Sequence, residues 1–595
     1  MSFINFPNVY SMLKTTVDKH LDEPAFAWFT APGIQTSITW KEHHDNVSRA
    51  AKSLMALGVN HNDKVNVLSY TCYPWMLADH ATMAIGAVTV GIYQSLLPKD
   101  CKYIINHSDA VVIFVENDEQ LAKIKDIRDE LPAIKKVIMF YDTPPTGDDW
   151  IISLGEFMKL GDSISDAELN KRINAVKPED IAGIVYTSGT TGVPKGAMLT
   201  HDNFLFTCQS IEQSLDVRDG DVCFLFLPMA HVFARICAMA CTFIGVQVTM
   251  ARGMDTIVED IKASRPNWFP SVPRIYEKVY SKVLSGAEAK GGVALKIFRW
   301  AVGVGNEVSA LKQQNKPVSG LLGFKYNLAH KLVFHKIIEA LGGNLRWCIS
   351  GAAPLNADIA KFFHAAGILI LEGIGMTENT SFSHVNRSDN YRFGWVGLPG
   401  PGVEQKIASD GEFMTRGRNT MKGYYKMPEE TAATITDDGW LCTGDLGEID
   451  DAGFLRITGR KKDLIITAGG KNVAPSHIEG VIATSKYINQ VCVIGDRRKY
   501  LSALVTLDLD NVREYANSHG IQYGSDSDLL KNAKIAELID SEVQEKNRDF
   551  ASYESIKKVT IVPEFTVENG FLTPTLKVKK NVVINNYESD IEKMY

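Results

Sequence analysis

The residues with the clearest chemistry lie in one stretch, residues 184–199, which contains four small hydroxyl residues, three glycines and one lysine. Hydroxyl groups and the backbone amides of glycine-rich turns donate hydrogen bonds to phosphate oxygens, and a lysine adds a mobile positive charge. We therefore expect a loop that grips the phosphates of a nucleotide. The residues expected to do so are Thr187, Ser188, Gly189, Thr190, Thr191, Gly192 and Lys195.

Two common phosphate-binding loops do not fit this stretch. A Walker A loop needs Gly-x4-Gly-Lys-Ser/Thr followed by a helix, whereas here Lys195 precedes Gly196 and residues 197–199 favour a strand. A dinucleotide-binding turn needs Gly-x-Gly-x-x-Gly, and the pair Gly303 and Gly305 lacks the third glycine. The expected order is therefore strand, loop, strand.

Three charged residues further along the chain are candidates for the same site. Glu378 follows Thr377 where a strand is expected to end, and a carboxylate there can hold Mg²⁺ beside phosphates. Asp445 is placed to accept the two ribose hydroxyls, and Arg460 to reach ribose or phosphate. Taken singly, each also fits a plainer role: a solvated loop glutamate, a turn aspartate and the rim of a basic hairpin.

The elements that must position these residues alternate between helix and strand. An amphipathic pattern predicts a helix over Thr39–Leu57 and a strand over Lys64–Ser69, and the rhythm recurs over Met76–Ile92. Such alternation is typical of a parallel sheet covered by helices. Short strands at Leu345–Cys348 and Ile368–Leu371 end in glycine-rich turns, and the carboxyl edge of an open α/β sheet is where ligands bind.

The segment Val222–Ala251 is apolar enough to raise the question of a membrane span. Pro228, His231 and Arg235 lie within it, and each is unfavourable in lipid, so we expect a buried strand over Val222–Leu227, a turn and a buried helix.

Two further local expectations concern helices elsewhere in the chain. Helical structure is predicted over Ser264–Tyr280, and a charged helix around Asp526–Asp549. The pair His43-His44 is expected to be exposed on a helix, and with no His-Glu-x-x-His present we expect no protein-caged zinc.

Length and composition limit the remaining possibilities. The chain has 595 residues, of which 45% are hydrophobic and 22% charged, so we expect a folded α/β protein of two or more domains. The net charge of −7 and pI near 6.1 argue against a broad nucleic-acid surface. Nine scattered cysteines without a Cys-x-x-Cys pair, and no apparent signal peptide, favour the cytoplasm.

The domain boundary is predicted near Arg460. Residues 1–460 would form a large domain of parallel-type sheets and helices, with a β-rich subdomain at about 397–458 where glycine and proline are dense. Residues 461–595 would form a small, mobile α+β domain.

These pieces, in this order, resemble the adenylate-forming superfamily, which contains acyl-CoA synthetases, firefly luciferase and the adenylation domains of peptide synthetases. The resemblance covers roughly residues 20–585, and its nearest branch is the long-chain fatty acyl-CoA synthetases. The residues that carry this branch are Leu227–Arg235, Arg265–Tyr276 and Glu568–Lys577.

The resemblance implies a role for each candidate residue. Thr187 and Glu378 would lie near Mg²⁺, and Asp445 and Arg460 would contact the ribose. Lys462 would be the hinge between domains, and Lys577 the lysine that completes acyl-adenylate formation. Trp440 and the segment around His231 would lie near the acyl entrance. The adenine pocket would be formed by Ala352, Ala353, Gly373, Ile374, Gly375, Met376 and Thr377.

The activity implied is that of an ATP-dependent, AMP-forming fatty acid–CoA ligase with ATP and Mg²⁺ as cofactors and coenzyme A as co-substrate. The partners implied are a fatty acid and coenzyme A and no nucleic acid; peripheral membrane contact and a homodimer are left open. The alternatives are a medium-chain or aryl-CoA ligase, a fatty acyl-AMP ligase, or a non-catalytic binder on the same scaffold.

Two departures from the branch pattern stand out. Ile374 occupies the position where the branch usually carries a tyrosine that stacks on adenine, so the ring–ring contact is lost. Leu576 precedes Lys577 where other members carry glycine, and Lys579 lies two residues on, so Lys579 is the alternative candidate for the catalytic lysine.

Overall fold

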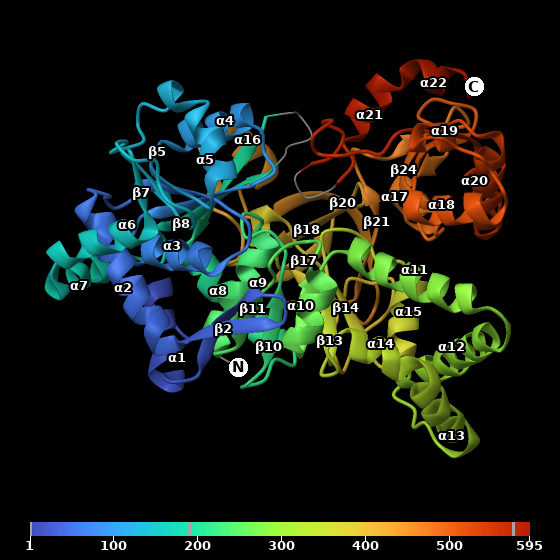
Figure 1. Ribbon diagram of the computed structural model, residues 1–595, viewed down its shortest axis with the longest axis horizontal. Helices are drawn as coiled ribbons and strands as arrows, with labels where there is room; N and C mark the ends of the chain where they lie inside the picture. Colours follow the sequence, from blue (N-terminus) through green and yellow to red (C-terminus); the bar gives the residue numbers. More distant parts are fainter. Residues whose placement is uncertain (1–2, 188–192, 574–576) are drawn as a thin grey trace.

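The computed structural model describes residues 3–187, 193–573 and 577–595 (Figure 1). The predicted α/β architecture is confirmed, because two large and mainly parallel sheets with covering helices make up most of the chain, followed by a smaller α+β unit.

The first large sheet carries the phosphate-loop stretch. In the described chain its strand order is β19-β9-β8-β4-β3-β5-β6-β7, and the six strands from β8 to β7 run parallel. The strands are β3 (Lys64–Leu68), β4 (Val88–Ile92), β5 (Ala110–Val115), β6 (Lys136–Met139), β7 (Ile151–Ser153), β8 (Ile181–Thr187), β9 (Lys195–Thr200) and β19 (Gly423–Tyr424).

The second large sheet carries the glycine-rich turns. Its order over the described residues is β16-β15-β14-β13-β12-β10-β11-β1-β2, with a parallel centre from β14 to β1. The strands are β1 (Pro24–Ala31), β2 (Ile34–Thr39), β10 (Val222–Leu225), β11 (Gln247–Met250), β12 (Trp268–Ser271), β13 (Trp347–Ser350), β14 (Leu369–Ile374), β15 (His384–Val385) and β16 (Leu398–Pro399).

Helices cover both sheets and fill the space between them (Figure 1). They are α1 (Val9–His20), α2 (Trp40–Ala56), α3 (Tyr73–Ala84), α4 (Pro98–Ser108), α5 (Asp118–Lys125), α6 (Leu154–Leu160), α7 (Asp166–Ala175), α8 (His201–Ser214), α9 (Val232–Ile244), α10 (Ile257–Ser264), α11 (Pro273–Lys290), α12 (Gly292–Gln313), α13 (Gly320–Ala329), α14 (His335–Ala340), α15 (Ala357–Ala365) and α16 (Pro428–Thr434).

The segments after the second sheet form two smaller units. A four-stranded sheet contains β17 (Glu404–Ile407), β18 (Glu412–Arg416), β20 (Leu441–Ile449) and β21 (Leu455–Arg460). The C-terminal unit contains β22 (Ile465–Ile466), β23 (Asn472–Val473), α17 (Pro475–Ile482), β24 (Ile488–Ile494), β25 (Leu501–Leu507), α18 (Leu509–Ser518), α19 (Asp526–Leu530), α20 (Ala533–Lys546), β26 (Ile556–Ile561), α21 (Lys580–Asn586) and α22 (Glu588–Glu592). It packs its own hydrophobic clusters, and Lys486 pairs with Glu288 of α11 at 2.6 Å.

Local sequence explains where several helices begin. Thr39 caps α2 in a capping box with Glu42, and Thr200 caps α8 in the same way with Asn203. The apolar segment that follows α8 forms β10, a turn and the buried helix α9, as the sequence predicted. No helix within the described ranges is both long and apolar enough to cross a bilayer.

Three local predictions are wrong. Residues 268–271 form the buried strand β12, and the helix expected from Ser264 begins only at Pro273, because proline fits the first turn of a helix but not its interior. The charged C-terminal helix is two helices, α19 and α20, separated at Asn532, which caps the second. His43 is fully buried, with Nε2 2.9 Å from Nδ1 of His80.

One buried ion pair joins the helical layers of the two sheets. Arg235 of α9 donates from Nε and Nη2 to Asp79 of α3 at 2.9 and 2.5 Å, and only 1% of Arg235 is exposed. The guanidinium also lies against Gly183 of β8, where a Cβ atom would come within 2.2 Å of Nη1. Gly183 therefore lets the charged group pack directly under the strand that leads to the phosphate loop.

Removing this pair should destabilise the protein strongly. Arg235→Met leaves the Asp79 carboxylate buried without a partner, and we expect a loss of about 3–5 kcal/mol in the free energy of unfolding. The measurement is the denaturant midpoint. The control is Lys14→Met, which breaks an ion pair with Asp18 on the surface and should cost less than about 1 kcal/mol. Equal shifts for the two variants would contradict the prediction.

Candidate active site

The phosphate-loop stretch forms the antiparallel strand pair β8–β9, as the strand-loop-strand prediction requires. Thr187 ends β8 and stands opposite Lys195, the first residue of β9. Gly196 lies so close to Ile184 and Tyr186 that a Cβ atom would approach the Ile184 side chain at 2.7 Å. The predicted phosphate ligands Ser188, Gly189, Thr190, Thr191 and Gly192 lie outside the described residues.

Lys195 is held by contacts from a distant segment. Its ammonium forms an ion pair with Glu430 of α16 and lies 5.4 Å from the centre of the Tyr424 ring. The hydrogen bond from Lys195 lowers the pKa of Glu430, and the charge of Lys462 adds a smaller effect in the same direction. The charge of Lys195 at the start of β9 is therefore neutralised by Glu430, a carboxylate that an incoming anion can replace.

Glu378 lies in a single 3₁₀ turn, η4 (Thr377–Asn379), just after β14. It is 7% exposed, and its Oε1 accepts a hydrogen bond from the Tyr424 hydroxyl at 2.5 Å. Tyr424 belongs to β19, which pairs with β9. Tyr424 thus connects Glu378 at the edge of the second sheet to the Lys195 strand of the first.

Asp445 and Arg460 face each other across the β20–β21 pair. They are register partners, and Arg460 Nε lies 3.6 Å from Asp445 Oδ1. Burial raises the pKa of the Asp445 carboxyl, while the charges of Arg460 and Lys577 oppose that rise.

Lys577 reaches this group from the C-terminal unit. The residue as a whole is exposed, but protein atoms surround its ammonium, and this desolvation lowers its pKa. The charge of Arg460 lowers the pKa further, whereas the charges of Asp445 and Glu378 oppose the decrease. Lys577 is therefore within electrostatic reach of Arg460, Asp445 and Glu378. Three segments far apart in the sequence approach one another here: the turn after β14, the β20–β21 pair and the segment of Lys577.

A narrow apolar cavity of about 50 Å³ lies beside this point. It runs between α8, α9 and strands β12 to β14, and it reaches the turn predicted to hold adenine. Its lining includes the predicted residues His231, Ala352, Gly373, Ile374 and Gly375 together with apolar side chains such as Ile236, Ala240 and Trp268.

Backbone geometry around the cavity is unusual at several positions. Ala352 adopts a left-handed conformation with φ of 71°, and Thr380 and Ser381 do so at 54° and 63°. Non-glycine residues in this region are uncommon and concentrate at ligand sites. Ala353 is exposed beside Ala352, and Met376 and Thr377 continue from the Ile374–Gly375 turn into η4, so the predicted adenine residues form two adjoining turns.

His231 caps α9 at the wall of this cavity. Its Nδ1 accepts the Phe233 amide at 3.1 Å. Burial, with a smaller contribution from the Lys577 charge, lowers the pKa of His231 to about 4. The neutral ring that accepts at Nδ1 carries its proton on Nε2, where it can donate a hydrogen bond.

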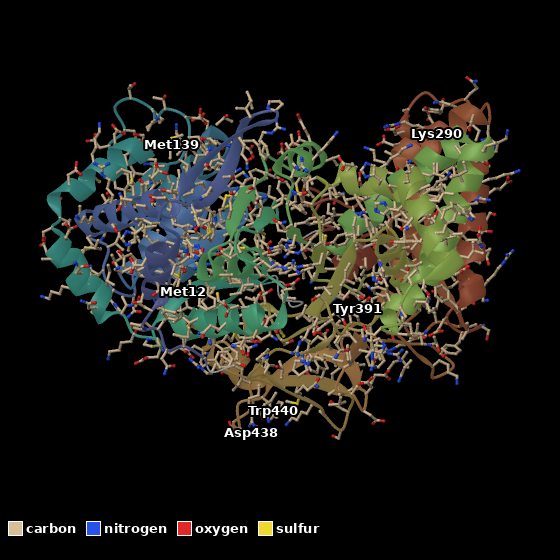
Figure 2. The ribbon with its side chains drawn as sticks, turned by 90° about the horizontal axis from the view of Figure 1, so that it is seen from below. Met12, Met139, Lys290, Tyr391, Asp438 and Trp440 are labelled. Carbon is tan, nitrogen blue, oxygen red and sulfur yellow. The ribbon has the colours of Figure 1, made fainter. Side chains whose placement is uncertain are left out.

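Within the described residues, no contact joins the Trp440 ring to another predicted site residue. Trp440 lies at the outer edge of the four-stranded sheet (Figure 2), and its ring contacts Lys406 at 4.1 Å and Arg416 at 4.7 Å. Lys462 lies just beyond β21, near Glu430.

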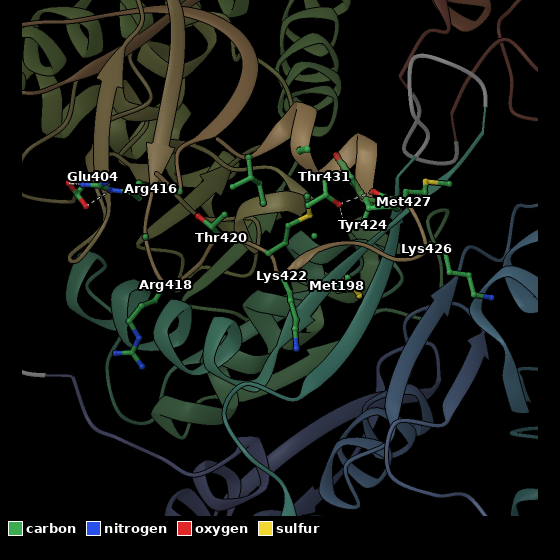
Figure 3. Close-up of a pocket in the computed structure, with 17 residues that line it drawn as sticks. Met198, Glu404, Arg416, Arg418, Thr420, Lys422, Tyr424, Lys426, Met427 and Thr431 are labelled. Atoms are coloured by element: carbon green, nitrogen blue, oxygen red, sulfur yellow. Dashed lines mark hydrogen bonds and ion pairs between the residues drawn. The ribbon is translucent and has the colours of Figure 1, made fainter. Parts of the chain in front are cut away.

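Sequence reasoning missed three residues that organise the site. Tyr424 and Glu430 hold Glu378 and Lys195, yet they lie 46 and 235 residues from those partners, so no local pattern pointed to them. Tyr424 also lines an open depression of about 930 Å³ (Figure 3), whose Arg416 is already paired with Glu404. The third residue is Glu372.

Glu372 lies in β14 just before Gly373 and connects this strand to two other segments. Its carboxylate accepts the backbone amides of Leu355 at 3.1 Å and Gly394 at 3.2 Å. It is buried at the end of β14, and burial raises its pKa to about 7 in spite of these two hydrogen bonds.

Comparison with known proteins shows which family the sequence matches and which structures share its fold. The AMP-binding enzyme family matches residues 13–425, and the AMP-binding enzyme C-terminal domain matches residues 462–595. The chain is 36% identical to long-chain-fatty-acid–CoA ligase FadD15 of Mycobacterium bovis, covering 95% of this chain and 93% of that one. It is 31% identical to the ACSBG2 long-chain-fatty-acid–CoA ligase of Xenopus laevis, covering 99% and 83%. The crystal structure of the adenylation domain of a Mycobacterium chelonae carboxylate reductase shares the fold, with a TM-score of 0.81, 22% identity and coverage of 99% and 91%.

Because the pKa of Glu372 is raised, the stability of the folded protein should depend on pH in a specific way. Its contribution to stability is fully present below pH 4.5 and is lost as pH rises to about 7, because the folded state disfavours the ionised carboxylate. In Glu372→Gln the side chain stays neutral at every pH. Relative to the unmodified protein, the free energy of unfolding of this variant should therefore rise by about 3 kcal/mol between pH 4.5 and pH 7. Denaturant unfolding at a series of pH values measures the difference.

The matched control is Glu168→Gln in the capping box of α7. Hydrogen bonds from Ser165 lower the pKa of Glu168, so its contribution to stability is present above pH 4.5 and is lost as pH falls below that value; the Glu168→Gln difference should therefore stay constant between pH 4.5 and 7. A Glu372→Gln difference that stays flat between pH 4.5 and 7 would disprove the assignment.

Proposed function

The chain belongs to the AMP-binding enzyme family, and we propose that it is an ATP-dependent, AMP-forming long-chain fatty acid–CoA ligase. The observation that carries the proposal is the convergence of Lys577, Arg460, Asp445 and Glu378 beside an apolar cavity. The names of its relatives and the match to both family domains support the same reaction.

In the first half-reaction, a carboxylate oxygen of the fatty acid attacks the α-phosphorus of ATP. The bond from the α-phosphorus to the oxygen bridging to the β-phosphate breaks, and pyrophosphate leaves. Two anions must approach each other, so Lys195 and Lys577 stabilise the charge that builds up in the transition state. We assign the ribose hydroxyls to Asp445 and Arg460, whose side chains already face each other.

The carboxylate of Glu378 and the hydroxyl of Thr187 fit the oxygen ligands that Mg²⁺ prefers. Glu378 is nearly buried, and among the described residues Tyr424 contacts its Oε1, which leaves Oε2 for an ion. When bound, Mg²⁺ supplies positive charge beside the phosphate oxygens.

In the second half-reaction, the sulfur of coenzyme A attacks the acyl carbonyl of the acyl-adenylate. The carbon–oxygen bond to AMP breaks, and the thiol proton passes to solvent. The two half-reactions need different protein groups beside the same acyl carbonyl carbon. We propose that residues 461–595 move about a hinge at Lys462 between the steps, while residues 1–460 hold the acyl-adenylate.

The apolar cavity is where we propose that the acyl chain binds; its volume of about 50 Å³ is smaller than that of a long acyl chain, so the side chains that line it must move apart when the chain enters. Burying methylenes in it contributes about 0.8 kcal/mol each before the entropy lost on association. Ile374 offers the adenine an aliphatic face at the mouth of the same cavity, and His231 presents its Nε2 proton to the reacting carboxyl end. Cytoplasmic location and a homodimer stay predictions.

Product analysis tests the reaction class directly. The protein is incubated with ATP, coenzyme A and a mixture of fatty acids, and the products are identified by mass spectrometry. We expect acyl-CoA with AMP and pyrophosphate. ADP would overturn the proposal, acyl-adenylate that coenzyme A does not consume would favour a fatty acyl-AMP ligase, and no turnover would favour a non-catalytic binder.

Lys577→Ala should separate the two half-reactions. Without its ammonium the charge on the attacked phosphate is not compensated, so adenylate formation falls by about 10²–10³-fold. Thioester formation from supplied acyl-adenylate should remain. Lys579→Ala is the matched control and should leave both steps intact; loss of adenylation in that variant alone would assign the role to Lys579.

Ala240→Phe should shorten the accepted acyl chain. The new ring fills part of the cavity, so kcat/KM for palmitate falls at least about tenfold while that for octanoate changes little. Ala240→Ser, which adds little volume, is the control. Equal losses for both fatty acids would place the acyl chain elsewhere.

A further inference from the structure

A stripe of exposed apolar side chains runs along α13 and the π-helical turn η3 (His330–Phe334) that continues it. The stripe residues are three or four positions apart, which places them on one face of the helix. They are Leu321, Phe324, Leu328 and Leu332, exposed by 69%, 68%, 41% and 42%.

The opposite side of the same helix is packed against the protein. Ala329 and Phe334 are buried, and the Tyr326 hydroxyl donates to the carbonyl of Ala365 at 3.1 Å. The helix forms the lower right tip of the molecule in Figure 1. The stripe is therefore fixed in position and faces outward.

Single exposed apolar residues are common on protein surfaces, but a contiguous apolar face marks an interaction site. Nothing in the fold requires leucine and phenylalanine at these positions, because their side chains contribute little to the core. A polar residue at each would serve a solvent-facing helix equally well.

The charge around the stripe is strongly positive. Residues 273–338 contain eleven lysines and arginines against three glutamates, although the whole chain carries −7. No acidic residue occurs between Lys312 and Ile338. Lys325, Lys331 and Lys336 are exposed, each three or four residues from a stripe residue, and none of them forms an ion pair with any described residue.

We propose that this lysine-flanked apolar face docks on the surface of an anionic phospholipid bilayer, with α13 lying in the plane of the interface. The apolar side chains would enter the boundary between headgroups and acyl chains, while the lysines extend to the phosphates. A helix of ten residues lies on a membrane rather than spanning it.

Charge favours lipid over a second copy of the chain. A two-fold contact between two α13 faces would bring the same unpaired lysines of both copies together, and their repulsion opposes such a dimer. An anionic surface instead offers a partner for each lysine. The inference concerns binding alone and goes beyond the proposed reaction.

Co-sedimentation of the full chain with vesicles tests the proposal. We expect binding to vesicles of equal parts phosphatidylcholine and phosphatidylglycerol, weaker binding to phosphatidylcholine alone, and weakening at high salt. Leu321→Ser/Phe324→Ser/Leu328→Ser should lower the affinity by at least about tenfold. Lys325→Glu/Lys331→Glu/Lys336→Glu should remove the preference for phosphatidylglycerol.

The control removes exposed apolar side chains elsewhere. Ile34→Ser/Val258→Ser changes residues of β2 and α10 exposed by 60% and 56%, and it should leave vesicle binding unchanged. Thermal unfolding of every variant should match that of the unmodified protein. Vesicle binding by the triple serine variant equal to the control would overturn the proposal. So would a dimer of the unmodified protein that the triple serine variant converts to a monomer, since a second copy would then cover the stripe.

Discussion

The buried pair Arg235–Asp79 is the contact on which the site geometry depends. Arg235 belongs to the helix that follows β10 of the second sheet, and Asp79 to the helix that follows β3 of the first. Neither charge can be exposed or left alone at low cost, so the two helical layers have one relative position in which both are satisfied. That position brings the end of β8 and the end of β14 to the same region, with Tyr424 bridging them.

The charges in the site compensate one another. Glu430 holds Lys195, and Arg460 faces Asp445. We propose that the phosphates of an entering nucleotide replace Glu430 on Lys195, which leaves the half-exposed Glu430 to solvent, and that the ribose hydroxyls pair with Asp445 and Arg460. Desolvation of the Lys577 ammonium by the surrounding protein lowers its pKa, and a desolvated cation interacts more strongly with phosphate than one in bulk water.

The turn predicted to hold adenine and the apolar cavity share a wall, and glycine makes this possible. A Cβ atom at Gly375 would lie 2.1 Å from the Ser381 carbonyl, and one at Gly373 would lie 2.9 Å from the His384 carbonyl. These close approaches pull the chain after β14 against β15 and leave Ile374 between the apolar cavity and the predicted adenine position. Glu372, next to Gly373, ties β14 to the segments of Leu355 and Gly394. A bound acyl group and a bound nucleotide would therefore meet at one short segment.

The sequence by itself determined the class of fold and predicted most of the residues proposed for the site. Periodic apolar residues and caps such as Thr39 and Thr200 specify local elements, and the composition of the hydroxyl- and glycine-rich stretch ending at Lys195 predicts a phosphate loop. These signals are local, so they can be read without knowing what the chain packs against. The error at Ser264–Tyr280 shows the limit, because the burial that makes residues 268–271 a strand comes from β10 and β13 on either side.

Only the tertiary structure decided which predicted residues meet. Lys577, Arg460, Asp445 and Glu378 converge, whereas Trp440 stays with Lys406 and Arg416 at an outer edge. The roles of Tyr424, Glu430 and Glu372 became visible only as contacts with partners in other segments. In the sequence, the apolar stripe on α13 likewise has the spacing of an ordinary core-facing helix. Only the fold shows that it is uncovered. The physical reason is common to all of these cases: burial and electrostatic pairing depend on distances between segments, and distances of that kind have no counterpart in local spacing.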